Sequence, residues 1–184
     1  KHTWAFSVKE LLCTNGFGHV WLEQGVGHRR AFLLAFRERL VEYYQREWHD
    51  GITSSERYDL YSTFKSYLSA ERYVDVLGLR CYKEAYVKFR FGMSTINIHQ
   101  HRYRNDVLPR HLVCPMCSSR EIEDEEHVLF DCVAYADLRI GIPALENRNP
   151  DGCSMVFSID CDEFILSIAR YLYHCLRRRE HLST

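Results

Sequence analysis

The feature that most constrains this fold is a set of three cysteines and one histidine near the middle of the chain. Two residues separate Cys114 from Cys117, nine separate Cys117 from His127, and four separate His127 from Cys132. Structural zinc is held tetrahedrally by four thiolate or imidazole ligands at about 2.0–2.3 Å. The CxxC turn brings two ligands to one ion, and the H-x4-C segment brings two more from the ends of about one helical turn. The spacing predicts a closed structural Zn²⁺ site made by Cys114, Cys117, His127 and Cys132, with no position left for a catalytic water.

The five other cysteines stand singly, mostly in apolar contexts such as Leu11-Leu12-Cys13. A framework of four disulfides is typical of small secreted domains, whereas 184 residues with 46% hydrophobic content can bury an ordinary core. We therefore expect buried free thiols and a reducing, intracellular environment, in the cytoplasm and nucleus. A redox CxxC is the alternative, but it is expected beside a βαβ pattern, and none is visible in the sequence.

Hydrophobic periodicity predicts a mainly α fold, a helical domain with an embedded CCHC zinc module. Apolar residues recur at helical spacing over residues 4–14, about 28–50, 79–91 and about 162–179, and shorter helices are expected near 55–64, 73–77 and 135–141. Strand signals are few and short, such as residues 154–159. We predict three regions: a helical region 1–93, a basic linker plus zinc module 94–145, and a C-terminal turn and helix 146–184 that packs back on the helical region.

No run of 18 apolar residues exists, so no transmembrane helix and no membrane partner are expected. The chain begins with Lys1 and carries no signal-like segment, which indicates a piece of a longer protein.

A local basic cluster lies between Arg80 and His111, although the whole chain has a net charge of only −1. Seven Arg and Lys residues stand there against two acids, and Tyr103 lies between two arginines. Arginines interleaved with an aromatic ring suit phosphate contact and base stacking. This pattern predicts an RNA- or DNA-binding surface made by Arg80, Lys83, Lys88, Arg90, Arg102, Tyr103, Arg104 and Arg110. The alternative is a set of solvated helix faces, and the same holds for the Arg177–Arg179 run.

The acidic run of residues 121–126 argues against phosphate binding on its own side of the zinc module. It is expected either to cap the helix that carries His127 or to bind a basic face of the parent protein.

Catalytic motifs are not recognisable in this sequence. Zinc deaminases need an HxE element before their CxxC, and no HxE exists here. No lysine follows Lys88, which argues against a downstream nuclease motif, and no P-loop, GxSxG or Rossmann glycine pattern is present. We therefore predict that the chain is not an enzyme.

The zinc segment resembles the C-terminal tail of animal non-LTR (LINE-type) retrotransposon polyproteins. The likeness rests on Cys114-x2-Cys117, on Glu123-Asp124-Glu125-Glu126-His127-x4-Cys132, and on Tyr135 and Leu138-Arg139. A weaker likeness covers Phe17-Gly18-x-Val20-Trp21-Leu22 and Gln24-Gly25-Val26-Gly27. In such polyproteins an endonuclease and a reverse transcriptase precede the tail, so the resemblance implies those domains as partners. It supports the four zinc ligands and assigns no catalytic residue.

Two functions follow as hypotheses. The first is a non-catalytic, zinc-stabilised accessory domain of a retrotransposon reverse transcriptase that binds RNA or target DNA. The second is a zinc-stabilised structural or protein-interaction module that docks on the parent polymerase or self-associates.

Overall fold

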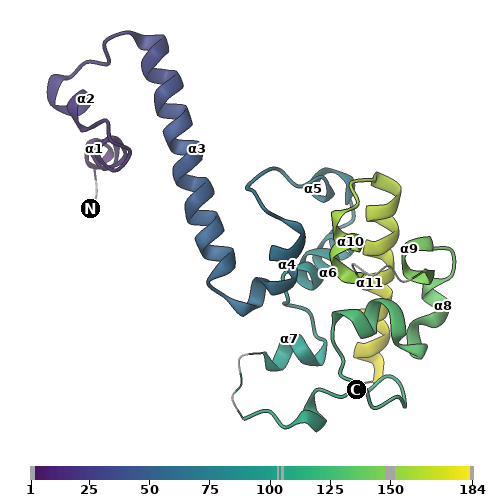
Figure 1. Cartoon of the computed structure of the whole chain (residues 1–184). Coiled ribbons are helices and arrows are strands. Elements are labelled where there is room, and N and C mark those ends of the chain that lie inside the picture. Colours follow the sequence, from purple (N-terminus) through teal and green to yellow (C-terminus); the bar gives the residue numbers. More distant parts are fainter. Residues whose placement is uncertain (1–2, 103, 105, 148–151, 183–184) are drawn as a thin grey trace. The chain divides into compact units, whose positions relative to one another are not determined.

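The computed structural model is mainly helical, as predicted, with 69% of its described residues in helices (Figure 1). It describes residues 3–102, 104, 106–147 and 152–182. Among these residues, the one pairing of extended backbone is an isolated antiparallel bridge between Val113 and Ile122. The chain divides into two compact units, Lys1–Gly51 and Ile52–Thr184.

The first unit contains α1 (Trp4–Thr14), α2 (Gly18–Glu23) and most of α3 (Arg29–Thr53). The Thr3 hydroxyl caps α1 by accepting the Phe6 N–H, and the helix ends at Asn15 as predicted. The Phe17 ring packs edge-on against Phe32 and Phe36, with centroid distances of 5.5 and 5.3 Å. These aromatic contacts join the short α2 segment to the long helix.

The second unit contains all of the remaining elements. They are η1 (Glu56–Tyr58), α4 (Asp59–Phe64), α5 (Tyr73–Val76), α6 (Arg80–Arg90), α7 (Asn97–His101), η2 (Pro109–His111), η3 (His127–Asp131), η4 (Val133–Tyr135), α8 (Ala136–Arg139), α9 (Pro143–Glu146), α10 (Gly152–Ser158) and α11 (Asp162–Leu182).

The core of this unit lies where α11 packs on α6. The apolar stripe predicted for the last helix is buried: Ile168 and Leu172 are fully enclosed, and they share one hydrophobic cluster with Phe89 of α6. The C-terminal helix therefore does pack back on a helix of the predicted region 1–93. The predicted boundaries at 93 and 145 do not coincide with the division between the compact units, which falls between Gly51 and Ile52.

Residues 152–158 form helix α10 and not the strand suggested by the sequence. Cys153, Val156 and Phe157 are all buried, and they recur at the three- and four-residue spacing of a helix. The β-branched and aromatic residues that suggested a strand are therefore explained by a short core-facing helix.

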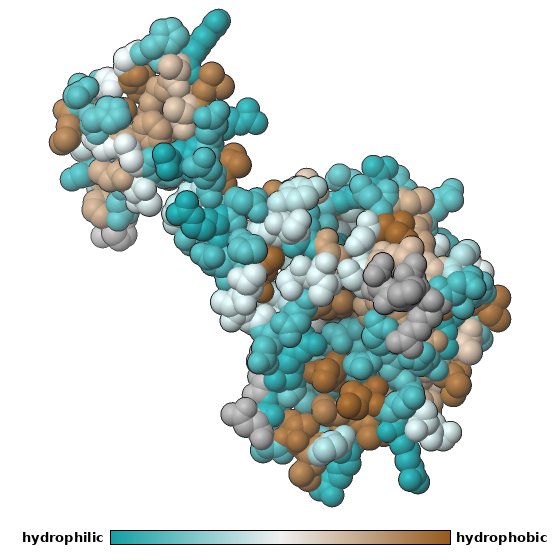
Figure 2. Space-filling model, in the orientation of Figure 1, coloured by the Kyte–Doolittle hydropathy of each residue, from teal (hydrophilic) through white to brown (hydrophobic). Residues whose placement is uncertain are grey.

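Hydrophilic side chains cover most of the visible face of each unit, with apolar patches between them (Figure 2). In the first unit the most exposed large apolar side chains are Trp4 and Leu22, and in the second unit they are Ile140 and Val133. None of the described helices combines the length and apolar character that crossing a bilayer requires.

Candidate metal centre

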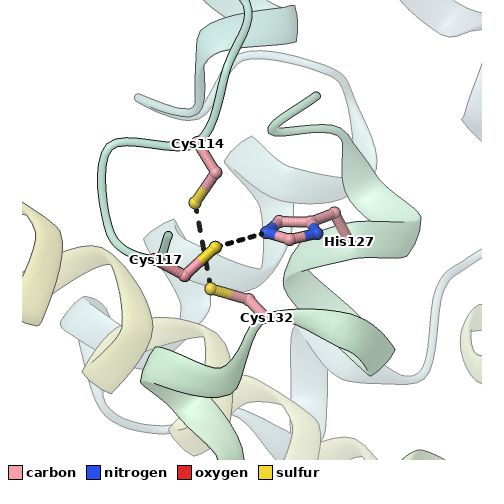
Figure 3. A group of neighbouring side chains, drawn as sticks. All are labelled: Cys114, Cys117, His127 and Cys132. Carbon is pink, nitrogen blue, oxygen red and sulfur yellow. Dashed lines mark hydrogen bonds between the residues drawn. The ribbon is translucent and has the colours of Figure 1, made fainter. Parts of the chain in front are cut away.

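The CxxC half of the site is a loop closed by backbone hydrogen bonds on both of its legs. The Cys114 N–H donates to the Glu121 carbonyl at 2.8 Å, and the Glu123 N–H donates to the Leu112 carbonyl at 2.7 Å. These bonds flank the Val113–Ile122 bridge. The loop between the two legs thereby directs the thiols of Cys114 and Cys117 toward the same point (Figure 3).

The other half is a π-helical turn, η3, which runs from His127 to Asp131. The Asp124 carboxylate caps its start by accepting the His127 N–H at 2.8 Å, and at its end the Cys132 N–H donates to the His127 carbonyl at 2.7 Å. This last bond joins residues five apart, the repeat of a π-helix. The H-x4-C spacing therefore places both ligands on one side of a single wide turn. The helical turn between them was predicted, but its π geometry was not.

The four predicted ligand residues come together. One ligand atom from each lies within 4.8 Å of every other. Cys114 Sγ and Cys132 Sγ are 3.8 Å apart, and Cys117 Sγ lies 3.4 Å from His127 Nε2 (Figure 3). A tetrahedron with bonds of about 2.0–2.3 Å has edges of about 3.3–3.8 Å. The cluster thus has the size and the soft donor set to hold a metal ion with all four positions filled by side chains.

Polar groups around the cluster support its ligands. The Met116 N–H donates to Cys114 Sγ at 3.4 Å, and the Ser119 hydroxyl lies 3.1 Å from Cys117 Sγ. The second ring nitrogen of His127, Nδ1, lies 3.0 Å from a carboxylate oxygen of Glu121. That contact lacks the alignment of a hydrogen bond. The N–H and hydroxyl contacts offset the charge of the thiolates, and a carboxylate beside the second ring nitrogen of a histidine ligand can orient its ring.

The paired thiols differ in acidity. The hydrogen bond between Cys114 and Cys132, with burial as the second cause, raises the pKa of Cys114 well above its ordinary value. The same hydrogen bond lowers the pKa of Cys132. A metal ion binds cysteine as the thiolate, so its binding at this cluster would release the thiol protons.

The carboxylates of the acidic run 121–126 form hydrogen bonds and ion pairs within the second unit. Glu123 is fully buried and accepts two hydrogen bonds from Arg179, at 2.8 and 3.0 Å. Asp124 caps η3, as one of the two sequence interpretations expected. The Glu126 carboxylate accepts the Cys153 N–H at the start of α10, at 2.9 Å. These carboxylates connect the metal module to the helices around it.

Glu125 joins the module to the segment before it. Its Oε1 lies 2.8 Å from His99 Nε2 and accepts a hydrogen bond from Arg102 at 3.0 Å. Burial raises the pKa of the Glu125 carboxyl, but the hydrogen bond and charge of His99 outweigh it and hold that pKa at about 2. The other ring nitrogen of His99 lies 2.7 Å from the Ser94 hydroxyl. Two of the partners, Ser94 and His99, were not singled out as site residues from the sequence.

Asn97 is a further structural residue that the sequence did not reveal. Its backbone N–H donates to Glu123, its side-chain amide donates to the Val113 carbonyl, and its side-chain oxygen accepts from Arg179. All three distances are 2.8 Å. The polar partners are up to 82 residues apart in the chain, so no local periodicity signals them.

The predicted nucleic-acid surface is only partly exposed. Arg90 is 3% exposed and its guanidinium lies among aromatic rings, so it cannot lie on an open surface. Arg102 is held by Glu125 and by the carbonyls of Glu56 and Arg57. These two arginines contribute to packing inside the second unit, which corrects their place in the predicted surface. Tyr103 lies outside the described residues.

The other five predicted residues lie nearer to solvent. Arg80 and Lys88 both pair with Glu84 on α6, and the Lys83 ammonium donates to the Val74 carbonyl. Arg104 pairs with Asp106, and Arg110 is exposed. These five remain candidates for contact with a polyanion.

Three cysteines expected to be buried are exposed: Cys13, Cys81 and Cys161. Cys81 lies in the first turn of α6, one turn before the buried Ala85. All eight cysteines are free thiols.

Comparisons with protein families, with curated proteins and with solved structures found no match for this chain.

Proposed function

We propose that this chain is a non-catalytic, zinc-stabilised accessory module of a LINE-type reverse transcriptase polyprotein. The closed cluster of three thiols and one imidazole carries the proposal. Thiolate-rich tetrahedral sites favour zinc, and a site with four protein ligands serves folding because no position is left for substrate or water. The sequence resemblance supplies the polyprotein context, with the endonuclease and reverse transcriptase as upstream partners.

The module's proposed activity is binding of RNA or target DNA. The surface that supports this role consists of Arg80, Lys83 and Lys88 on α6 together with Arg104 and Arg110 in the segment before the metal loop. Each phosphate contact made by such residues releases counterions, so the affinity must fall steeply with salt. The free thiols support a reducing compartment, the cytoplasm and nucleus, for this activity.

Docking on the parent polymerase is the second candidate, and the charge balance favours it. Residues 52–184 contain 17 Arg and Lys against 19 Asp and Glu. Several of the arginines are also neutralised within the unit, such as Arg178 by Asp137 and Arg179 by Glu123. A module of this kind offers a weak electrostatic field to a polyanion, but it can still present a rigid surface to a protein.

Fluorescence anisotropy with labelled RNA and DNA hairpins, repeated across a salt series, tests the two roles. Nucleic-acid binding predicts submicromolar affinity that falls steeply with salt, and a loss on changing Arg80 and Lys88 together to Ala. The matched control is Arg39→Ala together with Arg46→Ala on α3, outside the proposed surface. No binding at low salt favours docking, which is then tested by co-purification with the upstream reverse transcriptase domain. The metal content of the purified chain tests the zinc assignment separately.

A further inference from the structure

A cavity of about 200 Å³ lies in the second unit, away from the metal cluster. The loop after α4, together with α5, α6 and α10 and the start of α11, provides its walls. Its lining combines aromatic and charged side chains, among them Lys65, Glu71, Tyr73, Tyr86, Arg90 and Phe157. Among the described residues that are predicted from the sequence to bind metal or nucleic acid, Arg90 alone is found in the lining of this cavity.

Arg90 is the unusual member of this lining, because it is a nearly fully buried cation with few hydrogen-bond acceptors. Its guanidinium carbon lies 4.6 Å from the Phe64 ring centroid and 5.0 Å from that of Tyr73. Both terminal nitrogens reach only one Glu71 oxygen, each at 3.4 Å, and the buried Nε has no partner among the described residues. A guanidinium offers five donors, so most of its hydrogen-bonding capacity is unused.

The buried part of the cavity wall also carries an excess of positive charge. Lys65, whose side chain is 11% exposed, approaches the Glu71 carboxylate at 3.3 Å, so two cations share a single carboxylate. One oxygen of Glu71 is also occupied by the Tyr61 hydroxyl at 3.0 Å. Arg72 lies at the exposed rim with Asp160 and Asp162, which together carry one net negative charge, so the surplus cation is confined to the buried part of the wall. An uncompensated buried cation is costly, and an anionic group in the cavity relieves that cost.

We infer that this cavity binds a nucleoside monophosphate group, with the phosphate at Arg90 and Lys65 and the base against the tyrosine rings. The inference rests on the proposed nucleic-acid function and names a terminal-nucleotide site for it. Phosphate oxygens supply several acceptors to Arg and Lys donors, and flat aromatic walls suit a single base. The ligand is either a free mononucleotide or the phosphorylated end of a strand, because a strand interior cannot reach a cation that is 3% exposed.

Isothermal titration of the zinc-loaded full chain tests the inference. The probes are uridine 5′-monophosphate, uridine, inorganic phosphate and benzoate. We expect the monophosphate to bind at least about tenfold more tightly than each of the other three, since only it uses both the cations and the rings. Equal binding of benzoate, or absence of monophosphate binding, overturns the inference.

A cavity-filling variant avoids removing the buried charges. Ala70 lines the cavity and is exposed, so Ala70→Trp is expected to fold and to abolish monophosphate binding. Ala35→Trp on the exposed surface of α3 is the matched control and is expected to bind as the parent does. Unchanged binding by Ala70→Trp overturns the assignment of the cavity.

Oligouridylates with and without a 5′-phosphate separate the two ligand sources and the two proposals. Tighter binding of the 5′-phosphorylated strand, lost in Ala70→Trp, identifies a strand end as the ligand, and binding of the mononucleotide alone identifies a free nucleotide. If strands bind with steep salt dependence while the monophosphate does not bind, the cavity assignment fails and the nucleic-acid role stands. If the monophosphate binds while no strand does, the nucleic-acid role fails and the cavity assignment stands.

Discussion

Glu123 and Arg179 form a two-point ion pair inside the second unit, although they lie 56 positions apart in the chain. The Glu123 side chain has no exposure to solvent and that of Arg179 has 10%. Glu123 lies four residues before a metal ligand, and Arg179 lies in the last turns of α11. The pair therefore joins the metal module to the helix that forms the centre of the hydrophobic core.

Glu123→Gln should strongly destabilise the second unit, because it removes the negative charge that accepts two hydrogen bonds from the buried Arg179 guanidinium. Breaking a buried pair costs about 3–5 kcal/mol. Urea unfolding of the metal-loaded chain, followed by circular dichroism, measures the loss. Glu163→Gln, at the exposed start of α11, is the control and should change the free energy of unfolding little.

Replacing both partners, Glu123→Leu with Arg179→Met, should cost less than the sum of the two single changes, since no unpaired charge remains. A Glu123→Gln protein that unfolds at the parent's urea concentration would show that the pair is not a stabilising link.

Cys117→Ser should lose the metal and unfold the segment of residues 110–140, because in small modules of this type the metal-binding free energy is also folding free energy. Elemental analysis should give one zinc per parent chain, and hydrogen exchange should show the loss of protection in this segment. Cys161→Ser changes an exposed thiol outside the cluster and should keep both the metal and the protection. A Cys117→Ser chain that retains one zinc and melts like the parent contradicts the site.

The metal cluster could be predicted from the sequence because each pair of its ligands is local. Cys114 and Cys117 belong to one turn, and His127 and Cys132 to another. Their spacing in the sequence therefore predicts that the two ligands of each pair lie close together. The long helices could be predicted for the same reason, as their apolar stripes repeat within one element. The π turn was missed because a five-residue spacing does not distinguish a π turn from an α turn followed by a bend.

The partners of the charged residues could not be predicted from the sequence, because these residues contact segments that are distant in the chain. Arg90 is buried because aromatic rings from three other helices and a carboxylate in the loop after α4 surround its guanidinium. The acidic run was expected to cap a helix or to bind a basic face of the parent protein, but Glu123 and Glu125 pair with residues of the same unit that lie far away in the chain. A cluster of charged residues in a sequence shows which charges are present. Which of them remain at the surface depends on ion pairs between distant segments of the fold.

Glu121→Gln should weaken metal binding without unfolding the metal-loaded chain. Glu121 lies 3.0 Å from the His127 nitrogen that does not face the cluster, where a carboxylate fixes the ring and strengthens the ligand. Loss of such a partner typically costs about 10–100-fold in metal affinity. Competition with a chromogenic chelator measures the effect, and Glu38→Gln, an exposed residue of α3 in the first unit, should leave the affinity unchanged. Equal affinities of Glu121→Gln and parent would show that Glu121 does not orient His127.

Thiol alkylation should sort the cysteines into three classes. Cys13, Cys81 and Cys161 are exposed and should react with iodoacetamide in the folded, metal-loaded chain. Burial raises the pKa of Cys175 to about 12 and also raises that of Cys153. Only the thiolate reacts, so raising the pH from about 7 to about 9 should speed labelling of the exposed thiols but leave these two protonated and unlabelled.

The three cysteines of the candidate metal cluster form the remaining class, and in the metal-loaded chain they should become reactive only after a chelator removes the ion. Peptide mass spectrometry measures each site, and unfolding in urea with a chelator should expose all eight thiols as the positive control. Labelling of Cys153 in the folded chain at the rate of Cys161 would contradict its burial. Labelling of Cys132 before chelation, at the same rate as Cys161, would contradict its role as a metal ligand.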